Sequence, residues 1–87
     1  MEQRFVDLTV PESMIKEPVI YTLGRQFEVV PNIFRADVTP TTGWAVLQLE
    51  GEASEIDRAI EWLRGHGITV QVGGEELLRA RDEAEGS

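Results

Sequence analysis

One stretch of the sequence, Val29–Gly51, constrains the fold more than any other because it has the pattern of a two-stranded hairpin. Apolar and polar side chains alternate along both halves, with a polar turn near Thr39–Gly43 between them. In the first half, one side of the strand carries Val30, Asn32, Phe34, Ala36 and Val38, and the other side carries Ile33, Arg35 and Asp37. The second half sets Ala45, Leu47 and Leu49 against Trp44, Val46, Gln48 and Glu50. Each half therefore has one face for a hydrophobic core.

The segments before the hairpin predict one strand and one helix. Gln3–Val10 alternates and stops at Pro11, which cannot donate a hydrogen bond to a sheet, so we expect a strand there. Apolar residues then recur every four positions up to Phe27, as in a helix with one buried face. Proline is tolerated only at the start of a helix, so the regular helix should start at Pro18, with Met14–Glu17 as a lead-in turn.

The segments after the hairpin predict a second helix and a last strand. Ser54 and Asp57 have the spacing of a capping box, and glycines from Gly65 onward end the helix. Its buried residues are expected to be Ile56, Ala59, Ile60 and Leu63. Ile68–Val72 alternates as a strand. The order β-α-β-β-α-β predicts an α+β, ferredoxin-like sandwich, with both helices on one face of an antiparallel sheet of strand order 4-1-3-2.

The length of 87 residues is that of one small domain, which can bury only a modest core. We expect the folded domain to cover residues 1–74. Residues 75–87 carry five acidic and two basic side chains and offer only Leu77 and Leu78 for burial. We therefore expect a frayed helix or a disordered tail there.

Composition excludes or disfavours several classes of function. The chain has no cysteine, so disulfides, thiolate metal sites and cysteine nucleophiles are ruled out. Its formal net charge of −8 argues against a nucleic-acid partner, because phosphates need clustered Lys and Arg. No apolar run is long enough to span a bilayer and no signal-peptide pattern opens the sequence. We expect a cytoplasmic protein without membrane insertion.

No set of residues has the pattern of a catalytic, metal or cofactor site. His66 lies between two glycines at a helix end, where we expect a structural role. The carboxylates that cluster in the sequence flank a helix N-terminus, where negative charge is favourable without any ligand; they are Glu50, Glu52, Glu55 and Asp57. We expect no catalytic residue, no metal, no cofactor and no enzymatic activity.

The sheet face away from the helices is expected to be unusually apolar. It would present Phe5, Ile33, Trp44 and Val46. Either a partner docks there, or these side chains lie over the stems of Arg35 and Gln48. Because Pro31 also indicates an edge strand, we expect a homodimer whose interface draws on Phe5, Pro31, Trp44 and Val46.

Six short segments, taken in order, resemble the NIL domain family. They are Lys16-Glu17-Pro18-Val19-Ile20-Tyr21, Arg25-Gln26-Phe27, Pro31-Asn32-Ile33, Gly43-Trp44, Leu49-Glu50-Gly51 and Ala59-Ile60-Glu61-Trp62-Leu63. The family is named for an Asn-Ile-Leu motif. Here Asn32 and Ile33 match it, and Phe34 stands in the third place, a departure that keeps apolar character. The resemblance covers about Phe5 to Val72.

This resemblance implies a function as well as a fold. Members of the family lie at the C-terminus of the ATPase subunit of methionine importers, where the domain pairs with its twin and binds methionine to shut transport down. Others are fused to a ferredoxin module in proteins linked to sulfur assimilation into homocysteine, and the Lys16–Tyr21 stretch is closer to that branch.

The resemblance therefore implies a non-catalytic regulatory module that binds L-methionine or a related sulfur amino acid. The expected ligand-binding residues are Asn32, Ile33 and Phe34. The expected partners are a second copy and a transporter ATPase or a sulfur-assimilation enzyme. The alternative is a protein-interaction subunit in sulfur-amino-acid (homocysteine/methionine) metabolism that binds no small ligand.

Overall fold

The computed structural model describes residues 1–86, with side chains described up to Arg81. The sheet has four antiparallel strands: β1 (Glu2–Val10), β2 (Val29–Val38), β3 (Gly43–Gly51) and β4 (Thr69–Gly73). Their order, β2-β3-β1-β4, is the predicted 4-1-3-2 order read from the other edge, so the α+β, ferredoxin-like fold is confirmed. The helices are α1 (Val19–Gln26), α2 (Ala53–Gly65) and α3 (Glu76–Gly86), and a 3-10 turn, η1, spans Glu12–Met14.

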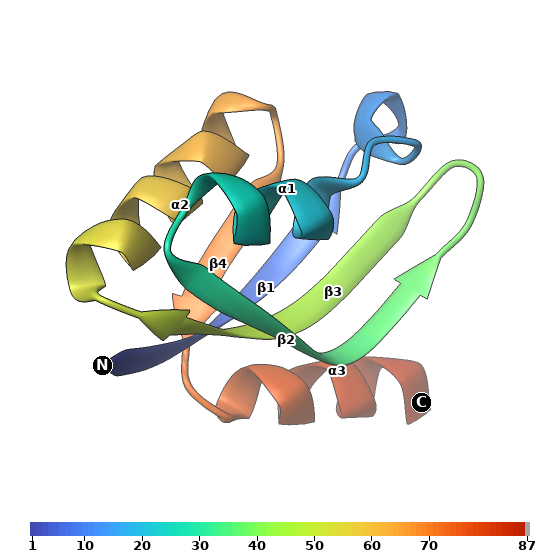
Figure 1. Ribbon diagram of the computed structural model, residues 1–87. Coiled ribbons are helices and arrows are strands. Elements are labelled where there is room, and N and C mark those ends of the chain that lie inside the picture. The colour runs from blue at the N-terminus through green and yellow to red at the C-terminus, as the bar shows by residue number, and fades with distance from the viewer. Residues whose placement is uncertain (87) are drawn as a thin grey trace.

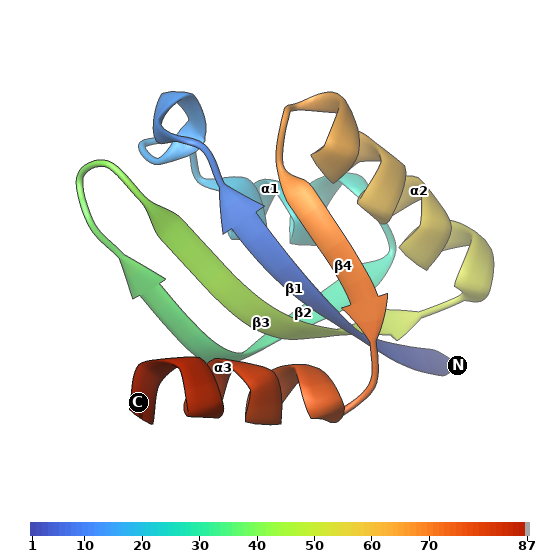
Figure 2. The same cartoon turned by 180° about the vertical axis from the view of Figure 1, so that it is seen from behind.

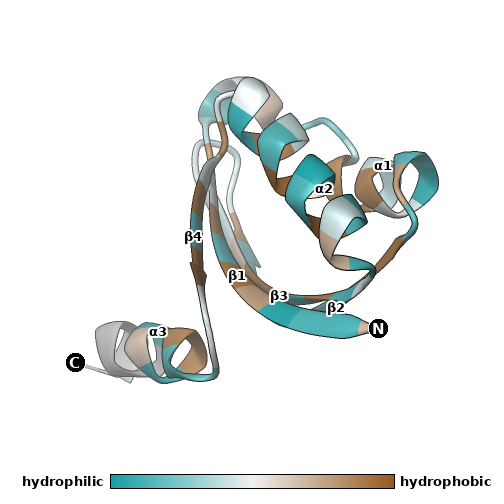
Figure 3. Cartoon of the chain, turned by 90° about the vertical axis from the view of Figure 1, so that its left-hand side faces the viewer, coloured by the Kyte–Doolittle hydropathy of each residue, from teal (hydrophilic) through white to brown (hydrophobic). Residues whose placement is uncertain are grey.

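Two of the helices cover one face of the sheet and the third lies on the opposite face. Figure 1 and Figure 2 show α1 and α2 side by side over the strands, and Figure 3 shows the sheet between this pair and α3. None of the helices in the described part of the chain is long and apolar enough to cross a bilayer.

The main core lies between the sheet and the α1–α2 layer. Its fully buried side chains come from alternate strand positions and from one stripe of each helix: Val6, Leu8, Leu23, Leu47, Leu49, Ile56, Ala59 and Leu63. The predicted stripe of α2 is buried as a whole. Burying apolar surface on both layers is what holds such a sandwich together, at roughly 25 cal/mol per Å² removed from water.

The helix starts differ in detail from the prediction. Pro18 occupies the N-cap position of α1, one residue before the helix. The lead-in contains the 3-10 turn η1 and, after it, the predicted turn over Met14–Glu17, in which the Glu17 N–H donates to the Met14 carbonyl oxygen (3.1 Å). The predicted capping box of α2 is wrong, because the helix begins at Ala53, after Glu52, and no side chain caps it. The Glu55 carboxylate instead accepts a hydrogen bond from the Glu28 N–H (3.0 Å) and thereby ties α2 to the chain just before β2.

A β-bulge in β2 corrects the predicted alternation of that strand. Ile33 pairs with Leu47 and Arg35 with Val46, which leaves Phe34 as the extra residue. An extra residue reverses the phase of a strand, because side chains alternate with a period of two. Before the bulge, Ile33 therefore shares the helix-facing side with the buried Leu47, opposite to the prediction, and Asn32 pairs with Gln48 on the other side. After the bulge, Ala36 and Val38 lie on the helix-facing side as predicted.

Helix α3 occupies part of the sheet face that was expected to lack intramolecular cover. Leu77 is buried at its start, and the Arg81 guanidinium donates two hydrogen bonds to the Asp7 carboxylate (2.9 and 3.0 Å). The same guanidinium lies 4.4 Å from the centroid of the Trp44 ring. These contacts lie in the segment expected to be a frayed helix or disordered, and the sequence reasoning did not anticipate them. Ser87 lies outside the described residues.

Candidate functional site

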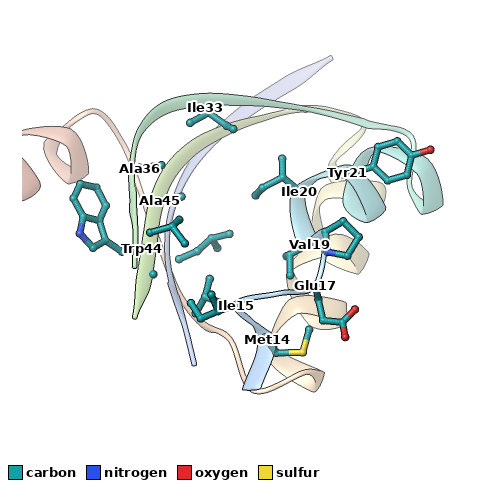
Figure 4. Close-up of a pocket in the computed structure, with 15 residues that line it drawn as sticks. Met14, Ile15, Glu17, Val19, Ile20, Tyr21, Ile33, Ala36, Trp44 and Ala45 are labelled. Atoms are coloured by element: carbon teal, nitrogen blue, oxygen red, sulfur yellow. The ribbon is translucent and has the colours of Figure 1, made fainter. Parts of the chain in front are cut away.

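An apolar pocket lies between the lead-in to α1 and the β2–β3 hairpin (Figure 4). Its volume is about 270 Å³. The α1 side contributes Met14, Ile15, Val19, Ile20 and Tyr21, and the sheet contributes Leu8, Val10, Ile33, Ala36, Val38 and Ala45. In Figure 4, Ile20 and Ile33 point into the same space from α1 and from β2.

The local sequence explains why the hollow forms there. Helix α1 has only eight residues and begins after Pro18, so it leaves the helix-facing side of the hairpin's outer half without a helix above it. The chain before it fills part of this space with Ile15. A side chain at Gly43 would place its Cβ only 2.9 Å from the Ile15 Cδ1, so the glycine permits the close approach that shapes the pocket floor.

The pocket opens at the edge of the sheet. Strand β2 is an edge strand, and Ile33 is 56% exposed although its side chain lines the pocket. Val38 and Tyr21 also line it and are exposed. An apolar wall that continues to an exposed edge can bind a small apolar group or a second protein surface.

Polar groups at the pocket are few. Glu17 lines its rim, but its carboxylate points away from the apolar space in Figure 4. No Lys or Arg lies among the residues that line it in the described part of the chain. The first turn of α1, Val19–Tyr21, lines the pocket and no side chain caps it. The Val19 N–H already donates to the Glu17 carbonyl oxygen (2.8 Å), which leaves the N–H groups of Ile20 and Tyr21 as the donors of this turn. The pocket is therefore suited to an apolar side chain, with polar recognition only at its mouth.

The three predicted ligand-binding residues do not form one site, because neighbouring residues of a strand face opposite sides and Phe34 is the bulge residue. Ile33 lines the pocket, whereas Asn32 is exposed on the opposite face of β2. Phe34 packs edge-on against Phe5 of β1, with the ring centroids 5.1 Å apart. Sequence reasoning missed the pocket residues Ile15, Ile20 and Tyr21, and the recurring apolar positions around Pro18 were the only signal that could have found them.

The four predicted interface residues also differ in accessibility. Val46 is fully buried on the side of the sheet that faces α3. Trp44 lies on the same side, near the guanidinium groups of Arg35 (6.0 Å) and Arg81 (4.4 Å). Phe5 and Pro31 are partly buried. Of the two surfaces considered for a dimer, the β2 edge is thus the more accessible.

Three of the four clustered carboxylates, Glu50, Glu55 and Asp57, have partners within the chain. Asp57 pairs with Arg4 (2.7 Å), and Glu50 accepts a hydrogen bond from Gln3 (2.7 Å). The pKa of Glu55 is lowered, first by the hydrogen bond from the Glu28 N–H and then by Arg58. Within the described residues, no group of three or more His, Asp or Glu side chains is arranged to hold a metal ion. These carboxylates stabilise the start of α2 and the neighbouring strands.

Comparison with solved structures identifies a similar domain. The C-terminal domain of an ABC transporter ATP-binding protein from Enterococcus faecalis superposes with a TM-score of 0.71 at 27% sequence identity, over 82% of this chain and 83% of that one.

Comparison with curated sequences leads to the same class of protein. Methionine import ATP-binding protein MetN 2 of Acinetobacter baylyi is 36% identical over 66 residues, which are 71% of this chain and 19% of the relative. MetN 1 of Bacillus cereus is 34% identical over 61 residues, 66% of this chain and 18% of the relative. The chain therefore matches about one fifth of the length of these relatives. The NIL domain profile matches residues 4–72, so the chain belongs to the NIL domain family.

Proposed function

We propose that this NIL domain is a non-catalytic regulatory module that binds methionine or a related amino acid in the apolar pocket and acts as a homodimer in the cytoplasm. Family membership supports the general role, since the matched relatives are methionine import ATP-binding proteins. The observation that carries the proposal is the pocket itself, whose wall includes Ile33 of the family motif.

The shape and chemistry of the pocket suit an amino acid with a flexible apolar side chain. Its volume of about 270 Å³ is below the roughly 300–1,000 Å³ of sites for drug-sized ligands. A thioether is polarisable and adapts to irregular apolar walls such as that formed by Ile15, Ile20 and Ile33. The charged ends of the ligand would stay at the mouth, where the N–H groups of Ile20 and Tyr21 in the first turn of α1 can meet the carboxylate.

A homodimer formed along β2 would complete this site. The strand is at the sheet edge, and its exposed apolar side chains are Val30, Ile33, Phe34 and Val38. Edge strands that leave apolar side chains and backbone groups in water tend to pair with another strand. Because β2 also forms the pocket wall, a second copy paired there would narrow the mouth and supply further polar groups to the ligand.

Calorimetry with L-methionine, D-methionine and leucine tests the ligand. We expect heat with L-methionine and weaker binding of the other two, and a Tm that rises with ligand concentration by mass action. Ile33→Ala should weaken binding if the pocket is the site. Asn32→Ala should leave binding unchanged if the ligand occupies the pocket, because Asn32 lies on the opposite face of β2. A loss of roughly 1–3 kcal/mol, the cost of a lost hydrogen bond to a charged group, would instead place the ligand at Asn32. No heat with L-methionine, or equal heat with all three, would refute the proposed ligand.

Light scattering tests the dimer. Val30 and Val38 are 51% and 64% exposed on β2, so Val30→Lys with Val38→Lys should split a dimer without loss of folding. Val72→Lys is the matched control, since Val72 is 43% exposed on β4 at the opposite edge. A monomer at high protein concentration, or a dimer that only Val72→Lys disrupts, would contradict the proposal.

A second function is favoured by the same exposed edge. If the β2 surface docks on another protein, a transporter ATPase or a sulfur-assimilation enzyme, the chain is an interaction subunit that binds no small ligand. The double variant Val30→Lys with Val38→Lys would then abolish partner binding, and calorimetry with amino acids would show no heat of binding. Heat with L-methionine that Ile33→Ala abolishes would decide against this alternative.

A further inference from the structure

A groove separate from the pocket interior runs between α1 and α2 on the outer side of the helical layer. Its centre is Trp62, which lines a hollow with Phe27 on one side and another with His66 and Glu17 on the other. Phe27 meets Trp62 edge-on at a centroid distance of 6.3 Å, and His66 lies against it at 4.4 Å. We call this surface, Glu17, Phe27, Glu61, Trp62 and His66, the Trp62 groove.

The Trp62 groove carries more negative than positive charge. Its carboxylates include Glu17 and Glu61, and the hollow that contains Glu61 is also lined by Asp57 and by one cation, Arg58. Glu17 and Glu61 are exposed, and neither forms an ion pair with a described residue. The His66 Nδ1 lies 2.8 Å from the Trp62 carbonyl oxygen, which can only accept, so Nδ1 donates and Nε2 of the neutral ring is left as an acceptor. A ligand for this surface should therefore bring hydrogen-bond donors and positive charge.

The aromatic rings favour the same kind of ligand. Arg58 already shows the interaction, because its guanidinium carbon lies 5.7 Å from the Phe27 ring centroid while the group pairs with Glu55 (2.8 Å). Cation–π contacts within the described side chains involve Tyr21, Phe27 and Trp44 and leave Trp62 without a cation. Tryptophan is the best cation–π partner among the aromatic side chains.

We propose that the Trp62 groove docks a basic segment of a partner protein, with an arginine or lysine side chain over Trp62 and between Glu17 and Glu61. Charge complementarity selects this occupant. A chain with net charge −8, and a groove in which carboxylates outnumber the one guanidinium, repel nucleic-acid phosphates and anionic lipid headgroups alike. The groove shares Glu17 with the pocket rim, but Trp62, Glu61 and Phe27 do not line the pocket and lie away from the β2 edge, so the inference does not require the proposed ligand or dimer.

The test is a titration followed by NMR with a capped synthetic peptide of Leu-Arg-Ala repeats. The indole N–H signal of Trp62, assigned by its loss in Trp62→Phe or by elimination with Trp44→Phe, should shift and saturate. The same peptide with citrulline in place of arginine keeps the shape and removes the charge. It should leave the Trp62 signal unchanged.

Charge variants decide whether the binding is local. Glu17→Gln with Glu61→Gln should weaken binding by about fivefold, as expected for the loss of two exposed charge contacts. The matched control is Asp37→Asn with Glu75→Gln, which removes the same charge from exposed residues outside the groove and should bind as the unchanged protein does. An unshifted Trp62 signal, equal weakening by both pairs of variants, or binding of the citrulline peptide would overturn the proposal.

Discussion

Arg81→Ala should release α3 from the sheet, and the structure allows the size of the effect to be worked out. The Arg81 side chain is 24% exposed and the Asp7 side chain 12%, and two hydrogen bonds join them. Hydrogen bonds to charged groups contribute roughly 1.5–3 kcal/mol when a partner is left unsatisfied. The cation–π contact with Trp44 at 4.4 Å adds about 0.5–1 kcal/mol.

The stability lost in Arg81→Ala cannot exceed the free energy with which α3 docks on the sheet. Once that free energy is lost, the helix detaches and the rest of the domain stays folded. We therefore expect Arg81→Ala to lower the free energy of unfolding by about 1–2 kcal/mol, which corresponds to a fall in Tm of roughly 5–15 °C for a domain of this size. Arg81→Lys keeps the charge but cannot form both hydrogen bonds in the same geometry. Its Tm should therefore lie between that of the unchanged protein and that of Arg81→Ala.

Thermal melting and urea unfolding measure the effect, and Arg79→Ala is the control, since Arg79 is exposed on the same helix. A double-mutant cycle with Asp7→Asn should give a coupling energy between Asp7 and Arg81. If Arg81→Ala has the same Tm as Arg79→Ala, or if the cycle shows no coupling energy between Asp7 and Arg81, the contact between α3 and the sheet does not stabilise the domain.

Three further predictions concern single positions. Gly51→Ala would place a Cβ 2.6 Å from the Glu28 carbonyl oxygen, whereas nothing lies within 4 Å of the corresponding atom at Gly65. Gly51→Ala should therefore lower the Tm and Gly65→Ala should not. Equal Tm values for the two variants would show that the backbone near Glu28 moves to accept the methyl group. Gly43→Ala should push Ile15 into the pocket and weaken L-methionine binding more than it lowers the Tm, a result that calorimetry and melting together can refute. The lowered pKa of Glu55 means that its carboxylate stabilises the fold above its ordinary pKa and that this stability is lost as the pH falls through the lowered value. Glu55→Gln should therefore reduce the Tm at neutral pH and not in acid, and a pH-independent difference would contradict this.

The strand order, the two core helices and the core could be predicted from the sequence because local signals agree there. Alternation marks the strands, and the four-residue spacing of apolar residues marks α1 and the stripe of α2. Pro11, Pro18 and Gly65 lie at or next to the ends of elements. Each of these signals is contained in a few consecutive residues, so no knowledge of distant contacts is needed.

The candidate site could not be predicted, because it depends on contacts between distant segments. The bulge at Phe34 leaves no mark in an alternating pattern beyond two adjacent apolar residues, yet it decides that Ile33 and Ala36 both face the pocket. The docking of α3 depends on contacts of Leu77 and Arg81 with the sheet, including those of Arg81 with β1 and β3. Two such residues in an otherwise acidic helix only weakly indicate in the sequence that the helix packs on the domain.

The bulge at Phe34 inserts one extra residue into the alternation of β2. The residues before Phe34 are set out of step with those after it, so the pocket receives Ile33 from before the bulge and Ala36 from after it. Deleting Phe34 would remove the bulge and leave Ile33 opposite Leu47 and Asn32 opposite Gln48, so isoleucine should still face the pocket, while the Phe5 ring would lose its edge-on partner. The bulge therefore adds one aromatic side chain beside Phe5 without changing which residue of β2 faces the pocket.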